Sequence, residues 1–213
     1  MSFVGGVGYS NIDLIYSGLD RLPDKGEEIF ARGFSMQFGG GIPATMINLS
    51  RLGVESRIIT FAGHDLFSEF VKKTLNSYPV KTVNLYKGNK MPVVLSSTLL
   101  YCGDRSFISY TDGMDLNDAV MDEVYENLKG AYVVDMHVGF LDVYKRLKKD
   151  GCIQIFDTGW EDDLTLEKYK DYLEIADYYI PNQKEAMKIT GTSSVEEAAD
   201  ILSEFFSDVT IKM

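Results

Sequence analysis

The chain has 213 residues, of which 45% are hydrophobic and 25% charged, as in an ordinary globular protein. Its formal net charge is −11, and a field of this sign repels polyanions, which excludes nucleic acid and anionic membrane surfaces as expected partners. Cys102 and Cys152 form no CxxC motif, and no stretch has the roughly 18 apolar residues of a membrane span. We therefore expect a cytoplasmic protein in a reducing compartment.

The expected elements change in kind along the chain. The first half contains a strand at 3–8, strand-like residues at 27–38, a helix from the triple glycine to Leu52, a strand at 56–63 and an amphipathic helix at 65–75. Three β-rich runs without a helix follow within 81–111. From Asn117 onward, helices and short apolar strands alternate up to a last expected strand at 208–213.

Helices that regularly separate short apolar strands imply right-handed crossovers. The predicted fold class is therefore α/β, with a doubly wound, mainly parallel sheet and helices on both faces. The β-only segments do not fit this alternation. We interpret them partly as extra strands of the main sheet and partly as a small β-sheet lid, with its strands within about 14–38 and 88–112. Ligands of such sheets bind beyond the carboxyl ends of the strands, which here means Gly8–Asp13, Gly39–Gly41 and Asp157–Trp160.

Three consecutive glycines, Gly39, Gly40 and Gly41, stand immediately before an expected helix. They either allow a sharp turn from strand to helix, or present bare amides that bind oxygen atoms of a ligand at the helix N-terminus. A P-loop is excluded, because no Lys-Ser/Thr pair follows the glycines. The residues alone leave both roles open.

Asn11 and Asp13 follow the first expected strand, where their side chains either bind a polyhydroxyl ligand or form an Asx turn. The nearby Gly6-x-Gly8 hints at the dinucleotide fingerprint, but Asn11 occupies its third glycine position. A nicotinamide dehydrogenase therefore ranks last among the hypotheses. Asp157 ends another expected strand, and it either holds a ligand hydroxyl or caps the next turn.

Asn182 and Glu185 have the spacing of a capping box at the start of a helix. The same two residues also suit a hydrated magnesium ion and its phosphates, with Glu185 as the metal ligand, because Mg²⁺ keeps several waters and takes one or two carboxylates. The two roles are compatible.

Four stretches, in sequence order, resemble the ribokinase (PfkB-type) carbohydrate kinase family. They are Asn11-x-Asp13, GGGIPATMINLSRLG at 39–53, FAGHDLFSEF at 61–70 and ADYYIPNQKEAMKITG at 176–191. The resemblance implies a doubly wound domain whose β-sheet lid covers the sugar and often mediates dimerisation. It also implies transfer of the γ-phosphoryl group of ATP, with Mg²⁺, to a hydroxyl of a sugar or related small alcohol.

The resemblance further implies roles for individual residues. Asn11 and Asp13 would bind sugar hydroxyls, and Gly39–Gly41 would let the sugar rest on the backbone. Asn182 and Glu185 would organise magnesium and phosphate. The expected partners are therefore a sugar, ATP and a second copy of the chain bound through the lid.

The sequence departs from the family pattern in two ways. Ala44 stands where the glycine-rich signature usually has Asn, so one sugar contact is absent or replaced. The family's catalytic aspartate lies in a Gly-Ala-Gly-Asp motif, which this sequence lacks. We therefore assign no catalytic residue within it, and expect it to be the N-terminal part of a longer kinase that is inactive without the rest. A non-catalytic sugar-binding or interaction module is the alternative.

Overall fold

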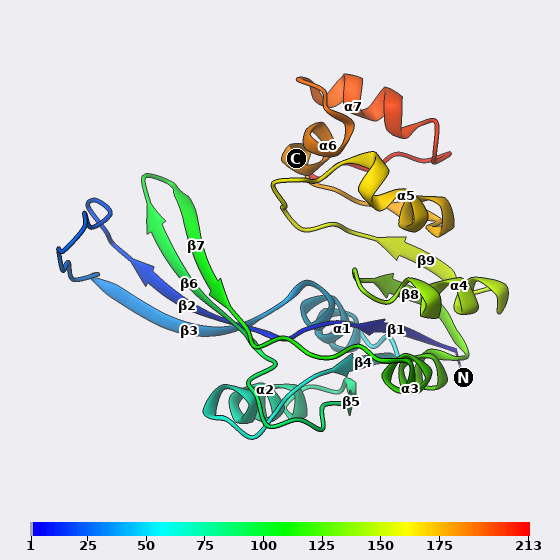
Figure 1. Ribbon diagram of the computed structural model, residues 1–213, viewed down its shortest axis with the longest axis horizontal. Helices are drawn as coiled ribbons and strands as arrows, with labels where there is room; N and C mark the ends of the chain where they lie inside the picture. The colour runs from blue at the N-terminus through cyan, green and yellow to red at the C-terminus, as the bar shows by residue number, and fades with distance from the viewer. Residues whose placement is uncertain (1) are drawn as a thin grey trace. The chain divides into compact units, whose positions relative to one another are not determined.

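The computed structural model describes residues 2–213, which form two compact units. The first unit contains the chain up to Val7, Val54–Arg57 and Leu116–Met213, and the second contains Gly8–Gly53 and Ile58–Asp115 (Figure 1). Within residues 2–213, no helix is long and apolar enough to cross a membrane.

The described strands form two sheets. The larger, six-stranded sheet has the order β10-β9-β8-β1-β4-β5, and the small, four-stranded sheet has the order β3-β2-β6-β7. The strands of the larger sheet are β1 (Phe3–Val7), β4 (Ser56–Thr60), β5 (Lys81–Asn84), β8 (Ala131–Met136), β9 (Ile153–Phe156) and β10 (Tyr178–Tyr179). The strand order reverses direction at β1, which is the doubly wound arrangement, and right-handed crossovers then place helices on both faces. The predicted α/β fold class is confirmed.

In the first unit, β1, β8, β9 and β10 pair in parallel. Their helices are α3 (Asp118–Leu128), α4 (Leu141–Lys149), α5 (Leu166–Ile175), α6 (Gln183–Thr190) and α7 (Val195–Leu202). Gly5 lets α3 approach β1, since a Cβ atom there would lie 2.7 Å from Leu128. Phe156 stacks on Tyr172 of α5, with 5.2 Å between the ring centroids. Burial of such rings fixes the ends of the strands, where ligands of α/β sheets bind.

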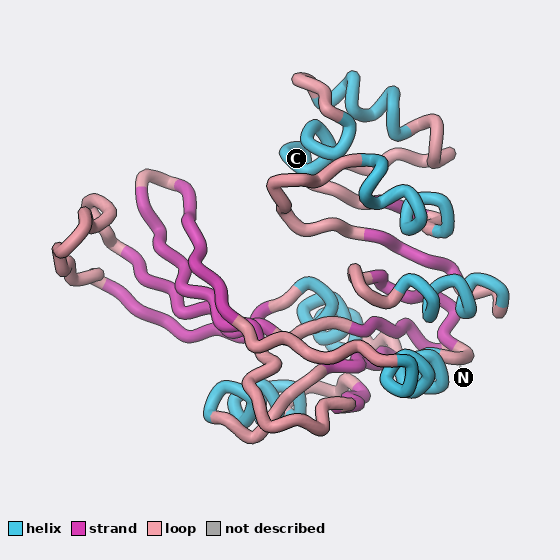
Figure 2. The backbone as a smooth tube through the Cα atoms, in the orientation of Figure 1, coloured by secondary structure: helices cyan, strands magenta, loops and turns pink. Residues whose placement is uncertain are grey.

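In the second unit, α1 (Gly41–Arg51) and α2 (Leu66–Asn76) accompany the small sheet. Asp65 caps α2 by accepting hydrogen bonds from the amides of Phe67 and Ser68. The small sheet consists of β2 (Asn11–Ser17), β3 (Gly33–Gly39), β6 (Val94–Tyr101) and β7 (Asp104–Tyr110), which are drawn as magenta strands in Figure 2. The pairs β2–β3 and β6–β7 are antiparallel, and β2–β6 is parallel.

The small sheet has two chemically different faces, because successive side chains of a strand point to opposite sides. One face, here called the Asp13 face, carries most of the polar side chains of the four strands. The opposite face, called the Ile12 face, is apolar except for Ser97, Ser106 and, at the far end of β7, Asp104. Its side chains are Ile12, Leu14, Tyr16, Phe34, Met36, Phe38, Leu95, Ser97, Leu99, Tyr101, Asp104, Ser106, Ile108 and Tyr110.

The structure corrects several expected boundaries. The strand expected at 27–38 begins only at Gly33, because the polar, turn-rich residues before it form a loop held by the ion pairs Arg21–Glu27 and Arg32–Asp20. The run at 208–213 is not a strand, since only Lys212 pairs with a neighbour, in an isolated parallel bridge to Asn182.

Candidate functional site

Asn11 and Asp13 lie inside strand β2, not in a loop after the first strand as the sequence suggested. The Asx-turn alternative is therefore wrong, because both residues are in extended backbone paired with β3. Asn11 is in register with Gly39, and Asp13 with Gln37. Since the two side chains are two residues apart on a strand, they share one face of the small sheet.

The first two glycines of the triplet make room for groups of the protein itself. A Cβ atom at Gly39 would lie 2.6 Å from Oδ2 of Asp13, so the bare backbone of β3 accommodates this carboxylate. Gly40 has a φ of +103°, and a Cβ atom there would lie 2.8 Å from the carbonyl oxygen of Tyr9. Gly40 therefore serves the sharp turn from β3 into α1.

Gly41 is different, because a Cβ atom there would meet nothing within 4 Å. It opens α1, whose N-terminus has no side-chain cap. The amide of Ala44 donates to the carbonyl of Gly40, and Pro43 has no N–H. The helix itself thus leaves the amides of Gly41 and Ile42 for another acceptor, at the positive end of its dipole. The space and the donors together suit an oxygen-rich ligand.

The environment of Asp13 opposes its negative charge. Burial raises the pKa of its carboxyl above the usual value, and the positive charge of Arg105 in β7 partly offsets this rise. Burial removes hydrogen bonds that water would donate to this carboxylate. Hydroxyl groups of a bound ligand would replace them. Asp13 is thus suited to binding a ligand that donates hydrogen bonds.

Asp157, Asn182 and Glu185 come together in the first unit. Asp157 follows β9, and its Oδ2 accepts a hydrogen bond from Lys212 Nζ at 2.6 Å. Lys212 is held beside the start of α6 by two backbone bonds, one to the carbonyl of Pro181 and one from the amide of Gln183. This pair is half-exposed, with side-chain exposures of 42% for Asp157 and 47% for Lys212.

The predicted capping box of α6 is confirmed. The side chain of Asn182 accepts from the amide of Glu185 at 3.0 Å, and Glu185 Oε2 accepts from the amide of Asn182 at 2.8 Å. Glu185 is only 6% exposed. Burial raises its pKa; the hydrogen bonds with Asn182 and the charge of Lys212 oppose this rise, and the charge of Asp157 adds to it.

Lys212 is the residue of this cluster that the sequence did not reveal. It stands in no motif, and its contact with Asp157 depends on the bridge that brings the end of the chain beside α6. Burial likewise raises the pKa of Asp157, against the bond from Lys212. The ammonium therefore stabilises the ionised form of a carboxylate that would otherwise be costly.

The sequence model of the pfkB family carbohydrate kinases matches residues 1–212. The chain belongs to this family. A provisionally named sugar kinase of Pyrococcus horikoshii is 35% identical over 92 residues, which cover 41% of this chain and 30% of that protein. The chain therefore matches less than a third of this curated relative's length.

Solved structures agree on the fold. The ribokinase of Arabidopsis thaliana, solved with ribose and ATP, has a TM-score of 0.76 at 21% identity, over 99% of this chain and 72% of that one. The ribokinase of Giardia lamblia has a TM-score of 0.79 at 18% identity, over 98% of this chain and 67% of that one.

The structural context of a dinucleotide fingerprint is missing from this pfkB-family chain. That fingerprint needs a strand that leads directly into a helix, so that the helix N-terminus faces the pyrophosphate. Here β1 is followed by strand β2, and Gly6 and Gly8 are both buried. A nicotinamide dehydrogenase therefore has no support.

The residues of the first unit fit a magnesium nucleotide. No group of three or more His, Cys, Asp or Glu side chains that could hold a metal occurs within residues 2–213. Glu185 and Asp157 are two carboxylates in one charge cluster, and Mg²⁺ usually takes one or two carboxylates together with waters and substrate phosphates. Of the two, Glu185 would hold the ion, with Asn182 beside it at the start of α6, because Asp157 is paired with Lys212.

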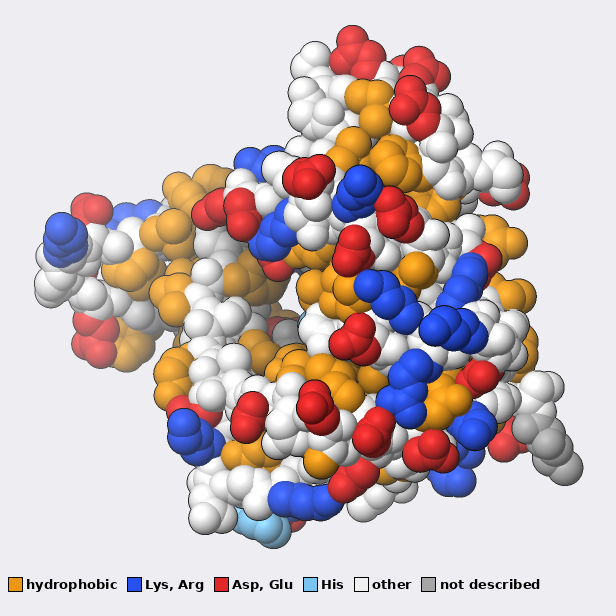
Figure 3. Space-filling model, turned by 45° about the vertical axis from the view of Figure 1, so that its right-hand side comes forward, with side chains coloured by type: hydrophobic (Ala, Val, Ile, Leu, Met, Phe, Trp, Pro, Cys, Tyr) orange, Lys and Arg blue, Asp and Glu red, His pale blue; other side chains and the backbone are white. Residues whose placement is uncertain are grey.

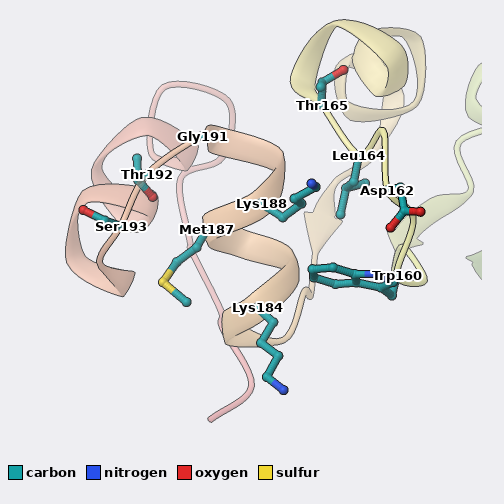
Figure 4. A pocket seen from close by; sticks show the side chains of 10 residues that line it. All are labelled: Trp160, Asp162, Leu164, Thr165, Lys184, Met187, Lys188, Gly191, Thr192 and Ser193. Atoms are coloured by element: carbon teal, nitrogen blue, oxygen red, sulfur yellow. The ribbon is translucent and has the colours of Figure 1, made fainter. Parts of the chain in front are cut away.

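The outer surface of α6 carries a separate groove of about 640 Å³ (Figure 4). Lys188 and Trp160 line it, with the ammonium 5.8 Å from the indole ring centroid. Trp160 is 58% exposed. Of its lining residues, only Trp160 belongs to a predicted ligand-binding segment, the turn Asp157–Trp160.

Proposed function

We propose that the chain carries the sugar-binding site and part of the nucleotide-binding site of an ATP-dependent kinase acting on a sugar or related small-molecule hydroxyl. The observation that carries this proposal is that Asp13 and Asn11 lie against Gly39, two residues before the open backbone at Gly41. A polyol needs acceptors for its hydroxyl protons and donors for its oxygens, and this place supplies both.

The sugar is held by charge-assisted and backbone hydrogen bonds. The carboxylate of Asp13 accepts from hydroxyls, while Asn11 both donates and accepts. The amide of Gly41 donates to a sugar oxygen, because no side chain keeps the ligand away from it. Binding of this kind orients one hydroxyl for transfer, and phosphoryl transfer depends mainly on such positioning.

On the nucleotide side, Asn182 and Glu185 organise Mg²⁺ and phosphate, and Asp157 holds a substrate hydroxyl. Bound Mg²⁺ neutralises developing charge on the phosphates. Glu185 is fixed for this role by its hydrogen bond to the amide of Asn182. No residue among 1–213 is proposed as the catalytic base, since the sequence has no Gly-Ala-Gly-Asp motif.

A thermal-melt screen of the 213-residue chain tests the proposal. A pentose or hexose is expected to raise the melting temperature, because a ligand that binds only the native state stabilises it by mass action. ATP-dependent phosphate transfer by this chain alone is not expected. If no sugar shifts the melt, the sugar kinase proposal is wrong.

A non-catalytic sugar-binding module is the second candidate, favoured by the missing Gly-Ala-Gly-Asp motif. Both candidates bind sugar, so nucleotide binding separates them. Protection by Mg²⁺-ATP supports the kinase, whereas sugar protection without any effect of Mg²⁺-ATP supports the module.

Glu185→Gln separates the charge of Glu185 from its capping role. Glutamine also closes a capping box, so the melting temperature is expected to stay unchanged or rise. A carboxyl with a raised pKa destabilises the fold when it is ionised at neutral pH, and glutamine removes that cost. Mg²⁺-dependent ATP binding is expected to weaken about tenfold or more, as the loss of a direct charge contact implies.

The matched control for this substitution is Glu197→Gln in α7. Glu197 has the same spacing from its cap residue, Ser194, but is exposed. Titration with a fluorescent ATP analogue and Mg²⁺ should show no change for the control. Equal weakening of sugar and nucleotide binding by Glu185→Gln would instead assign Glu185 a purely structural role.

The Ile12 face of the small sheet supports a homodimer. Phe34 is 61% exposed, Met36 40%, Ile108 71% and Tyr110 58%. Hydrophobic side chains are visible on this projecting sheet at the left of Figure 3. Contiguous apolar surface of this kind marks an association site. We propose that a second copy of the chain covers it.

The double substitution of Phe34 and Ile108 by Asp is expected to convert a dimer into a monomer, because it places charges in the middle of the interface. Analytical ultracentrifugation measures the mass. Leu52→Asp is the control, since Leu52 is 80% exposed at the end of α1. A monomeric unsubstituted chain would contradict the proposal.

A further inference from the structure

A row of polar side chains crosses all four strands of the small sheet at the level of Asp13. Gln37 in β3, Asp13 in β2, Ser96 in β6 and Ser109 in β7 are direct cross-strand neighbours. Residues in register on adjacent strands point to the same side of a sheet. The row therefore places a carboxamide, a carboxylate and two hydroxyls on the Asp13 face, and of the two hydroxyls that of Ser109 is the exposed one.

The serine end of the row is held in place by an internal contact. The hydroxyls of Ser96 and Ser109 lie 2.8 Å apart. Ser96 is only 4% exposed, whereas Ser109 is exposed. The buried Ser96 thus fixes the orientation of Ser109, which keeps hydrogen-bonding capacity toward the face of the sheet.

The neighbouring row of cross-strand residues lies on the Ile12 face and is apolar. Phe38, Ile12, Leu95 and Tyr110 are its four cross-strand neighbours. A sheet with both faces in water does not require polar and apolar side chains to be on separate faces. Here one face carries a continuous polar row and the other a continuous apolar row, which indicates that the two faces meet different environments. The Asp13 face is the one that a hydrophilic ligand would meet.

The polar row is long enough to contact several groups of one ligand. Neighbouring strands lie about 4.8 Å apart, so Gln37 and Ser109 are separated by three strand spacings, or roughly 14 Å. Asp13 lies about one spacing from Gln37 and two from Ser109. A ligand held at Asp13 therefore has a polar side chain within reach on either side.

We propose that the substrate lies across this row, and that Gln37 and Ser109 are specificity-determining residues which select a neutral, hydroxyl-rich sugar. This inference rests on the proposed sugar site at Asp13. Asp13 is the one charged member of the row, so a carboxylate or phosphate on the substrate would be repelled there. The cation on the same face, Arg105, lies four residues from Ser109 along β7, and its charge acts on Asp13 and offsets part of this repulsion.

The test compares Gln37→Leu and Ser109→Ala with the unsubstituted 213-residue chain, using D-ribose and D-fructose as probes. Each substitution is expected to weaken binding of the preferred sugar about three- to tenfold, the effect of one neutral hydrogen bond. Ser109→Thr, which keeps the hydroxyl, is expected to restore affinity. Isothermal titration calorimetry measures the dissociation constants.

Ser106→Ala is the matched control, because Ser106 lies on the same strand but on the Ile12 face. Ser109→Ala also leaves Ser96 without its contact and can lower stability, whereas Gln37 is exposed and Gln37→Leu avoids this complication. The proposal is supported if both substitutions weaken the sugar and the control does not. It is overturned if Gln37→Leu and Ser109→Ala leave sugar affinity unchanged.

The result also separates this inference from the proposed function. If Asp13→Ala removes sugar binding while the row substitutions have no effect, the sugar site stands and the row is not part of it. If neither D-ribose nor D-fructose binds the unsubstituted chain, this inference is overturned, and the proposed function fails as well if no other sugar shifts the melt. Tighter binding of D-gluconate than of either neutral sugar would overturn the selection for a neutral substrate.

Discussion

Asp13→Ala is expected to abolish the stabilisation of the chain by sugar while leaving the fold intact. The carboxylate is the one negative group in its row, and hydrogen bonds to a charged acceptor contribute about 1.5–3 kcal/mol each. Loss of two such bonds weakens binding by roughly 100-fold or more. The fold should tolerate the change, because burial raises the pKa of Asp13 and its ionised form is destabilising at neutral pH.

Melting curves with and without sugar measure both effects at once. Asp20→Ala is a suitable control, since Asp20 lies in the β2–β3 loop with its side chain 85% exposed. Asp13→Asn should bind sugar weakly, because the amide keeps the shape but loses the charge. Sugar protection that survives Asp13→Ala would remove this residue from the site.

The sugar affinity should also depend on pH through Asp13. Its folded-state pKa is raised above the ordinary value of about 3.9. The carboxylate that accepts hydroxyl protons is present above this pKa and is lost as the pH falls through it. Sugar binding is therefore expected to weaken on acidification at a pH where an ordinary aspartate is still ionised.

Alanine substitutions at Gly40 and Gly41 are expected to have opposite consequences. Gly40→Ala forces a side chain into a left-handed backbone 2.8 Å from the carbonyl of Tyr9, which costs about 2–3 kcal/mol. For a chain of this size the melting temperature should fall by roughly 4–12 °C. Gly41→Ala should change stability by less than about 0.5 kcal/mol, because its side chain meets open space.

Gly41→Ala should nevertheless weaken sugar binding about tenfold or more, since the added methyl group occupies the place of the ligand. Melting temperature and sugar affinity, measured on both variants, distinguish a structural glycine from a ligand-facing one. Unchanged sugar affinity in Gly41→Ala would mean that the open space beside α1 is not where the sugar rests.

Most of the fold could be predicted, because its signals are local. The alternation of helices and apolar strands predicted the α/β class, and the capping box of Asn182 and Glu185 followed from spacing alone. The hydrogen bonds of such a cap join residues two or three apart, so both partners can be recognised within one short motif.

The remaining features depend on contacts between distant segments. Asn11 and Asp13 were expected in a turn because they are polar and closely follow the first strand, and the pairing of β2 with β3 and β6 identifies them as strand residues. Lys212 meets Asp157 across 55 residues of sequence. The row from Gln37 to Ser109 likewise exists only through strand register.

The most direct test of the sugar site is an amide NMR titration of the 213-residue chain with the sugar that stabilises it best. We expect the amide signals of Gly39, Gly40 and Gly41 to shift together with that of Asp13, and the shifts to disappear in Asp13→Ala. Shifts confined to other parts of the chain, with these four amides unmoved, would contradict the account.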